Sequence, residues 1–206
     1  MNRFEPRLDI LPASQRALWP HLQFARDRFV LYGGTALALR LGHRASVDFD
    51  LFSFHPFTTA ELLRATPWLS AAERLQVEVN TLTVLHRSEH GPVKVSFFGG
   101  LTFGQVQEPE ETSDGTMRVA SLPDLFATKL NTVYQRAEAR DYLDVHAMLA
   151  AGLSLTEGLA WTKKVYGADF NTLLPLQALC YFEEPSLRVL PQSVKDDLVG
   201  AVQAVT

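Results

Sequence analysis

Residues 29–52, with the sequence FVLYGGTALALRLGHRASVDFDLF, decide the fold of this chain. Their pattern predicts a strand, a glycine turn, a short helix, a basic loop and a second strand that carries Asp48 and Asp50. On a strand, residues i and i+2 point to the same face, with Cα atoms roughly 6.5–7 Å apart. Two carboxylates placed in this way can share divalent cations about 3.5–4 Å from each other.

The turn at Gly33 and Gly34 opens directly into the predicted helix. Backbone N–H groups at such a turn can bind an anion such as a triphosphate. The glycine turn and the aspartate pair each have a structural alternative. A Gly-Gly pair is commonly just a tight turn, and an Asp-x-Asp strand can be a solvated face or a capping pair. The combination favours function, because aspartates in a buried strand need a cation or donors and Arg44 alone could not satisfy both. A phosphate cradle beside metal carboxylates is what a metal-dependent nucleotidyltransferase needs.

Two stretches resemble the AbiEii/AbiGii-type nucleotidyltransferase toxins, a family within the DNA polymerase β nucleotidyltransferase superfamily. GGT at 33–35 and LGHRASVDFD at 41–50 are similar to motif I of that family. Lys129, Arg136 and the RDYLD run at 140–144 are similar to its downstream Lys/Arg and Asp motifs. The motifs together span residues 29–144, which is most of the chain.

The resemblance implies transfer of a nucleoside monophosphate from an NTP to an RNA or protein hydroxyl, with release of pyrophosphate. Asp48 and Asp50 would be catalytic and would hold Mg²⁺, with Mn²⁺ as the alternative. Lys129 would be the third catalytic residue, offsetting charge on the leaving phosphates, and Asp141 would support it. The expected nucleotide-binding residues are Gly33, Gly34, Thr35, Arg44, Lys94 and Arg136. An antitoxin protein is the implied partner, and tRNA is one acceptor to consider.

Several of these residues have an ordinary structural interpretation as well. Lys129 lies on an apolar helix face, where a lysine usually extends its ammonium to solvent. Arg136 and Arg140, spaced i and i+4, could share a face and bind phosphate, or could pair with nearby aspartates. Thr35 could donate to a triphosphate or cap its helix. Arg44 could hold a phosphate or lock an aspartate.

The chain departs from the family at the third carboxylate. Where the family carries Lys-x-Asp on a neighbouring strand, this chain has Lys94-Val95-Ser96. A serine hydroxyl is a weak neutral ligand and no general base at its ordinary pKa. Loss of a general base typically lowers a rate by about 10²–10⁴-fold. Glu78, on an adjacent predicted strand, is the candidate substitute if its side chain faces the two aspartates.

The remainder of the sequence indicates an α+β protein, in which a nucleotidyltransferase-like mixed sheet with flanking helices precedes a helical C-terminal half. We expect a core over 1–120 with an N-terminal helix, and a helical subdomain over 121–206 packed on it. Residues 107–115 are acidic and predict an exposed loop. Further strands are expected at 75–80, 81–85 and 93–98. Helices are expected at 14–28 with a kink at Pro20, 34–41, 123–135, 138–150, 155–166, 171–181 and 191–204.

Composition limits the other function classes. The 206 residues carry a formal charge of −4, so no global basic field indicates strong nonspecific nucleic-acid binding, although Arg40, His43 and Arg44 could form a local basic patch. The single Cys180 lies among apolar residues and is expected in the core. The sequence contains neither the apolar core of a signal peptide nor a run of eighteen apolar residues. We therefore expect no membrane partner and a cytoplasmic location.

Two rival functions remain open. Ser96 is compatible with a pseudoenzyme that binds NTP and metal without transferring anything. The paired aspartates are also compatible with a protein-interaction module, in which they serve structural pairing only. The first predicts nucleotide binding without turnover, and the second predicts no magnesium-dependent nucleotide binding.

Overall fold

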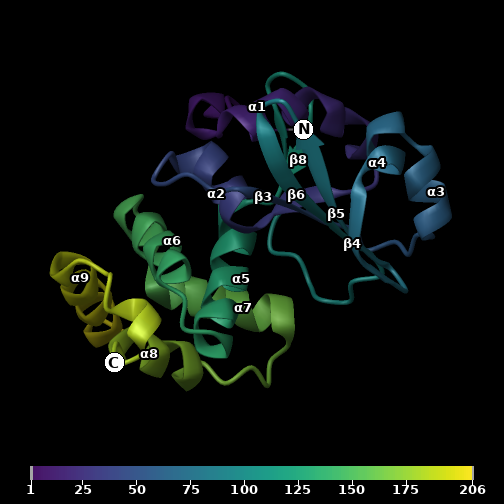
Figure 1. Ribbon diagram of the computed structural model, residues 1–206. Helices are drawn as coiled ribbons and strands as arrows, with labels where there is room; N and C mark the ends of the chain where they lie inside the picture. The colour runs from purple at the N-terminus through teal and green to yellow at the C-terminus, as the bar shows by residue number, and fades with distance from the viewer. Residues whose placement is uncertain (1, 206) are drawn as a thin grey trace. The chain divides into compact units, whose positions relative to one another are not determined.

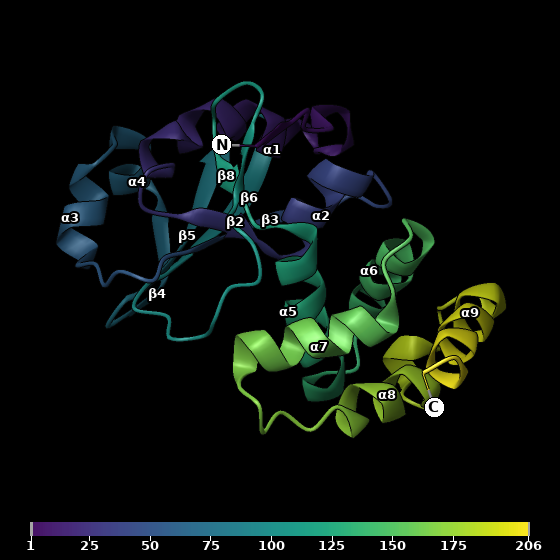
Figure 2. The same cartoon turned by 180° about the vertical axis from the view of Figure 1, so that it is seen from behind.

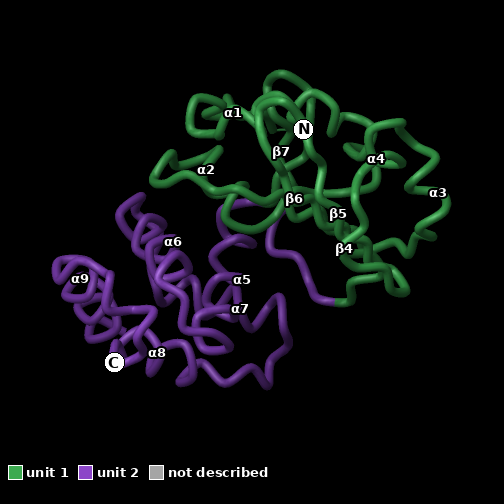
Figure 3. The backbone as a smooth tube through the Cα atoms, viewed as in Figure 1, with its two compact units in different colours: residues 1–102, 109–120 green, residues 103–108, 121–206 purple. Residues whose placement is uncertain are grey.

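The computed structural model describes residues 2–205, which form two compact units. Unit 1 comprises the chain up to residue 102 together with 109–120, and unit 2 comprises 103–108 together with the chain from residue 121 onward (Figure 3). The chain therefore crosses from unit 1 into unit 2 between Ala120 and Ser121. The expected packing of a helical subdomain on the core stays a prediction.

Unit 1 is built on an eight-stranded mixed sheet with the order β1-β7-β8-β2-β3-β6-β5-β4. In Figure 1, β3, β6, β5 and β4 follow one another across this sheet. The central strand β3 is antiparallel to β2 and parallel to β6. The expected mixed sheet is thereby confirmed. The strands are β1 (Arg3–Phe4), β2 (Val30–Tyr32), β3 (Asp48–Phe52), β4 (Glu73–Glu78), β5 (Thr81–Ser88), β6 (Gly91–Phe98), β7 (Glu110–Thr112) and β8 (Arg118–Val119).

One face of this sheet is the hydrophobic core of unit 1. Phe49 of β3 and Phe97 of β6 are fully buried. The rings of Trp19 and Phe24 approach them, with centroids 6.0 Å and 6.3 Å away respectively. Because neighbouring residues of a strand point to opposite faces, Asp48 and Asp50 lie on the other face. The helical segments of unit 1 are η1 (Leu8–Ile10), α1 (Ala13–Leu18), η2 (Trp19–Ala25), α2 (Gly33–Leu41), α3 (Thr59–Arg64) and α4 (Pro67–Ala71).

The helix ends of unit 1 follow the chemistry of the sequence. Thr58 and Glu61 form a capping box at the start of α3. Gly42 ends α2 with a φ of 62°, as expected of a left-handed C-terminal glycine. The continuous helix expected over 14–28 is wrong, since α1 stops at Leu18 and a 3₁₀ segment carrying Pro20 follows. Proline has no N–H group for the α-helical hydrogen bond, which explains the change.

Unit 2 is helical, as expected. Its central helix α5 packs against α6, α7 and α8, and α9 packs against α6 and α8 (Figure 2). Ser121 and Ser154 cap α5 and α7 through their hydroxyls, accepting from the backbone N–H of Asp124 and Glu157. The helices are α5 (Leu122–Gln135), α6 (Ala139–Ala150), α7 (Leu155–Tyr166), α8 (Leu173–Cys180), η3 (Pro185–Leu187) and α9 (Gln192–Gln203).

Two expectations from local pattern are wrong. The acidic segment 107–115 is not wholly an exposed loop, because β7 forms within it and pairs with β1 and β8. Such short strands depend on distant partners and leave no alternation to detect. Cys180 is exposed at the end of α8 and is not a core residue. None of the helices formed by residues 2–205 has the length and apolar character needed to cross a bilayer.

Candidate active site

Asp48 and Asp50 lie on the half-exposed face of β3, while the intervening Phe49 and the following Leu51 are fully buried on the opposite face. Strand alternation thus places both carboxylates on one surface, as the spacing predicted. Pairing with the neighbouring strands sets their surroundings. Asp50 lies opposite Tyr32 of β2.

The glycine turn lies directly against the Asp50 carboxylate. Gly33 has a φ of 74°, a left-handed conformation that glycine adopts without strain. A Cβ atom at this position would lie 2.8 Å from Oδ2 of Asp50. A side chain at position 33 would therefore be strained by the backbone conformation and would displace the Asp50 carboxylate. The start of α2, with its unsatisfied N–H groups, is adjacent to that carboxylate.

Arg44 folds back over the same turn. A Cβ atom on Gly34 would lie 2.6 Å from one guanidinium nitrogen of Arg44 and 3.0 Å from the hydroxyl oxygen of Ser46. Nη1 of Arg44 also donates to the carbonyl of Ala45, at 3.0 Å. The turn thus combines backbone N–H groups with a cationic fork that suits phosphate oxygens. Ser46 is not among the residues predicted for this site, although its position two residues before Asp48 was the available signal.

Thr35 connects the helix to the aspartate strand. Its buried hydroxyl donates to the backbone carbonyl of Asp48 at 2.5 Å, and it makes no side-chain cap of α2. A threonine hydroxyl has a single hydrogen to donate. Thr35 therefore holds the first turn of α2 against β3, a contact that the two sequence-based alternatives did not include.

The parallel neighbour β6 brings Lys94 and Ser96 to the aspartates. Lys94 lies opposite Asp48 and Ser96 opposite Asp50. Nζ of Lys94 is 2.9 Å from Oδ2 of Asp48, and the Lys94 side chain is 41% exposed. Ser96 is buried. The strand with the altered Lys-x-Asp pattern is thus the direct neighbour of the aspartate strand, and serine occupies the position beside Asp50.

Glu78 does not replace the absent acid. It lies on β4, which is separated from β3 by β6 and β5. Three strand spacings correspond to about 14 Å. Through the pairing of neighbouring strands, Glu78 aligns with Thr81, Phe98 and Phe52. Phe52 lies two residues after Asp50 on β3, so Glu78 is also displaced from the aspartates along the strand direction. The substitution hypothesis for Glu78 is therefore wrong.

Unit 2 collects the downstream residues in a separate cluster. Nζ of Lys129 in α5 lies 2.6 Å from Oδ1 of Asp141 and 2.7 Å from Oδ2 of Asp144, both in α6 and both fully buried. Nε of Arg136 lies 2.9 Å from Oδ2 of Asp141. Asp141 thus accepts from both Lys129 and Arg136, and its supporting role in a reaction stays a prediction. Lys129 is buried, so it does not extend to solvent as an ordinary surface lysine would.

Two basic residues expected near the site have structural partners. Arg140 pairs with Glu138 at 2.6 Å, and it does not share a helix face with Arg136, because α5 ends before Arg136. Arg40 pairs with Glu110, donates to the carbonyl of Val119 and lies 4.2 Å from the ring centroid of Phe4. Burial lowers the pKa of Arg40, although its hydrogen bond and ion pair with Glu110 oppose this change. Arg40 therefore stabilises the edge of the sheet.

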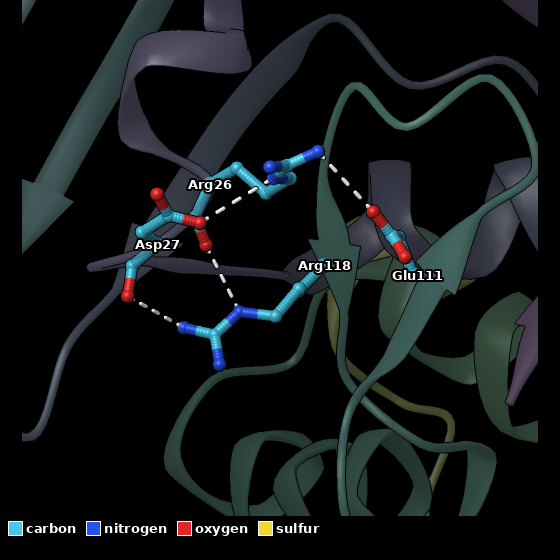
Figure 4. Close-up of a pocket in the computed structure, with 4 residues that line it drawn as sticks. All are labelled: Arg26, Asp27, Glu111 and Arg118. Atoms are coloured by element: carbon cyan, nitrogen blue, oxygen red, sulfur yellow. Dashed lines mark hydrogen bonds and ion pairs between the residues drawn. The ribbon is translucent and has the colours of Figure 1, made fainter. Parts of the chain in front are cut away.

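A cavity in unit 1 has a volume of about 180 Å³ and is lined by Arg26, Asp27, Glu111 and Arg118 (Figure 4). Its cationic groups are committed to protein oxygens. Arg26 pairs with Glu111 at 3.2 Å, and Arg118 donates to the carbonyls of Arg26 and Asp27 at 2.9 Å and 3.1 Å. These contacts fasten β7 and β8 to the segment after η2, so the cavity is a structural junction.

The donor chemistry of the aspartate face fits one hard divalent cation. Carboxylate oxygens suit Mg²⁺, which usually binds one or two protein carboxylates and completes its shell with water and phosphate oxygens. Among residues 2–205 no group of three or more His, Cys, Asp or Glu side chains is placed to hold a metal ion. Asp48 and Asp50 therefore suit a cation shared with a phosphate ligand.

Comparison with known proteins agrees with this geometry. Residues 16–199 match the family model described as the nucleotidyl transferase AbiEii toxin of type IV toxin–antitoxin systems. The uncharacterized protein aq_aa25 of Aquifex aeolicus is 32% identical over 160 residues, covering 76% of this chain and 74% of that protein.

Two solved structures share the fold. MenT4, a nucleotidyltransferase toxin of Mycobacterium tuberculosis, has a TM-score of 0.62 at 16% identity and covers 92% of this chain and 82% of its own. JHP933 of Helicobacter pylori has a TM-score of 0.58 at 16% identity and covers 93% of this chain and 89% of its own. With the family match extending over most of its length, this chain belongs to the AbiEii nucleotidyl transferase toxin family.

Proposed function

We propose that the protein is a Mg²⁺-dependent toxin that transfers a nucleoside monophosphate from an NTP to a hydroxyl group of RNA or protein. The observation that carries this proposal is the close approach of Asp50 to the glycine turn, where a Cβ atom on Gly33 would lie 2.8 Å from the carboxylate. A metal-binding acid and a phosphate-binding helix start thus share one surface, as transfer from a nucleotide requires.

The chain's own groups would orient the triphosphate. The unsatisfied N–H groups at the start of α2 favour anions, and Arg44 adds a charge-assisted fork above Gly34. Asp48 and Asp50 would hold the cation, and Thr35 fixes their strand to the helix through the carbonyl of Asp48. A bound divalent cation would supply charge neutralisation for the phosphates.

In the proposed reaction, the acceptor hydroxyl oxygen forms a bond to the α-phosphorus. The bond from that phosphorus to the bridging oxygen breaks, and pyrophosphate leaves with its electron pair. The hydroxyl proton passes to water, since Ser96 at its ordinary pKa does not act as a base. Positioning and charge stabilisation would carry most of the rate enhancement.

We propose a supporting role for the cluster in unit 2. Asp141 and Asp144 accept two of the three N–H donors of the Lys129 ammonium. The third donor would be available to a phosphate oxygen, and Arg136 would add to the same anion-binding role. Asp141 would orient both cations, because it accepts from each of them.

The family supports a proposal for the partner, and the charge of the chain supports one for the acceptor. Members are classed as toxins of a toxin–antitoxin system, so we propose a cognate antitoxin protein as partner. The formal charge of −4 favours an acceptor recognised by local contacts, such as the end of a tRNA or a protein hydroxyl, over nonspecific binding along a nucleic acid.

Ser96 supports one alternative. With serine beside Asp50, the scaffold could bind NTP and metal without transferring a nucleotide. This pseudoenzyme would show magnesium-dependent nucleotide binding, sensitive to loss of Asp50, and no turnover. It shares the binding chemistry of the main proposal and differs only in the transfer step.

Transfer of label from each α-labelled NTP, with magnesium, to total RNA and to protein tests the proposal. Wild type would be compared with the double variant Asp48→Ala/Asp50→Ala, with Ser96→Asp, and with Asp27→Ala as a matched control, because the Asp27 side chain is 89% exposed outside the site. We expect transfer by wild type and by the control, and loss of transfer in the double variant.

The other outcomes separate the rival functions. A silent wild type with an active Ser96→Asp variant would indicate the pseudoenzyme. If all variants are silent, magnesium-dependent NTP binding decides the matter. Its absence would contradict the proposed function and favour a protein-interaction module.

A further inference from the structure

Two side chains of β6 change the charge of the surface that carries the paired aspartates. The Lys94 ammonium lies 2.9 Å from a carboxylate oxygen of Asp48. Ser96 is buried directly beside Asp50, where it contributes a neutral hydroxyl. Lys94 therefore offsets one of the two negative charges, and Ser96 adds none.

The nearer strands β2 and β5 do not restore that charge in the same rows of the sheet. On the opposite side of β3, the residue facing Asp50 is Tyr32. Beyond β6, the residues facing Ser96 and Lys94 are Thr83 and Leu85. All three side chains lack a carboxylate. Farther along the row of Asp48, Glu73 of β4 lies three strands away from β3 and pairs with Arg87 at 2.9 Å. On β2, β3, β6 and β5, the rows of Asp48 and Asp50 thus contain two acids and one ammonium.

Two divalent cations about 3.5–4 Å apart, as in two-metal sites, repel each other about four times as strongly as two single charges at that distance. Bridging carboxylates must offset this repulsion. A third acid would help, but serine stands at that position, and Lys94 adds a positive charge next to the oxygen that a cation would use.

We infer that the site takes a single divalent cation and that this cation arrives with the nucleotide. The inference rests on the proposed function and specifies the metal content of that same site. The Lys94 ammonium pairs with the carboxylate of Asp48 until the nucleotide binds, and its phosphates then compete for the ammonium. The phosphates then supply negative charge and oxygen ligands that the protein surface lacks. Lys94 is accordingly a positioning residue that links metal binding to nucleotide binding.

Binding of Mn²⁺, followed by the loss of its free electron paramagnetic resonance signal, tests this inference without any turnover. The protein would be titrated with Mn²⁺ alone and with Mn²⁺ plus a non-hydrolysable NTP analogue. For wild type we expect negligible binding of Mn²⁺ alone, and a single Mn²⁺ for each bound analogue. Melting curves would establish that each variant is folded.

Two variants sharpen the result. Lys94→Met is expected to bind Mn²⁺ alone at least about tenfold more tightly than wild type, since a charge within a few ångströms shifts ion binding to a carboxylate by that order. Ser96→Asp is expected to bind a second Mn²⁺ with the analogue. Lys163→Met, an exposed lysine of α7, is the matched control and should behave as wild type.

The outcomes distinguish the inference from the function beneath it. Two Mn²⁺ ions for each analogue in wild type would overturn the inference and leave the proposed function intact. Tight binding of Mn²⁺ alone by wild type, unchanged in Lys94→Met, would also overturn it. Absence of any Mn²⁺-dependent analogue binding by wild type would overturn the proposed function and the inference together.

Discussion

The aspartate pair of β3 and the aspartate pair of α6 have similar sequence spacing, but the structure offsets their charges in different ways. Asp141 and Asp144 are fully buried, and the buried Lys129 lies within 2.7 Å of both. Asp48 and Asp50 are half exposed, and Lys94, which pairs with Asp48, is 41% exposed. The first pair is enclosed by protein cations, whereas the second keeps access to solvent.

This difference separates two uses of carboxylates. A buried acid must be paired, because an unpaired buried charge is strongly destabilising. A half-exposed pair loses less hydration, so it can exchange water or a flexible lysine for a bound cation. Similar residues thus hold buried and half-buried protein cations in one unit and form a candidate metal site in the other.

The largest expected effect is on the buried cluster. Lys129→Met leaves Asp141 and Asp144 without their shared ammonium, which should lower the free energy of unfolding by about 3–5 kcal/mol. For a chain of this size that corresponds to a fall in Tm of roughly 6–20 °C. Urea and thermal denaturation would measure it. Lys94→Met is the matched control and should change stability by less than about 1 kcal/mol. Equal losses in both variants would contradict the comparison.

The glycine turn tests how the exposed pair is held. Gly33→Ala places a methyl group on a residue with a φ of 74° and 2.8 Å from Oδ2 of Asp50. We expect a loss of about 1–3 kcal/mol in stability from backbone strain, with weaker Mg-NTP binding as Asp50 is displaced. Denaturation and nucleotide titration would measure the two effects. Unchanged nucleotide affinity would show that the position of Asp50 is not required.

Substitution of a helical glycine in unit 2 is expected to increase stability, in contrast to Gly33→Ala. Gly200 lies within α9, and a Cβ atom there would meet nothing within 4 Å. Gly200→Ala should therefore raise the free energy of unfolding by about 0.5–1 kcal/mol, because alanine loses less backbone entropy in a helix. Urea denaturation measures this gain. A loss of stability would show that Gly200 makes a contact that its surroundings do not indicate.

Another small effect concerns an acid held by neutral donors. Burial raises the pKa of Asp114, but hydrogen bonds from Thr112, Trp19 and Thr116 outweigh it, so the pKa is lower than its ordinary value. Because the folded pKa lies below the unfolded one, the carboxylate adds stability above the unfolded pKa, and this is lost as the pH falls through the folded pKa. Asp114→Asn should cost about 1 kcal/mol at neutral pH.

Denaturation at pH 7, 5 and 3 would check the linkage. Wild type should lose more stability than Asp114→Asn between pH 5 and pH 3, so the two curves should converge in acid. Parallel curves would show that Asp114 does not titrate differently in the folded and unfolded protein.

Much of the fold followed from local pattern. The residues 29–52 predicted β2, α2 and β3 in order, and the helices expected at 123–135 and 155–166 correspond to α5 and α7, which begin after the capping serines Ser121 and Ser154. These features depend on spacing within a few residues, where strand alternation and capping chemistry act directly. The short strands β1, β7 and β8 were not predicted, since each is formed through pairing with distant residues.

The sequence by itself determined that Asp48 and Asp50 share a face beside a glycine turn, because a period of two residues orients strand side chains whatever surrounds them. Only the tertiary structure decided which side chains meet those acids. The register of β3 with β6 places Lys94 and Ser96 there, and the strand order removes Glu78. Strand order and register arise from contacts between distant segments, and no local spacing contains them.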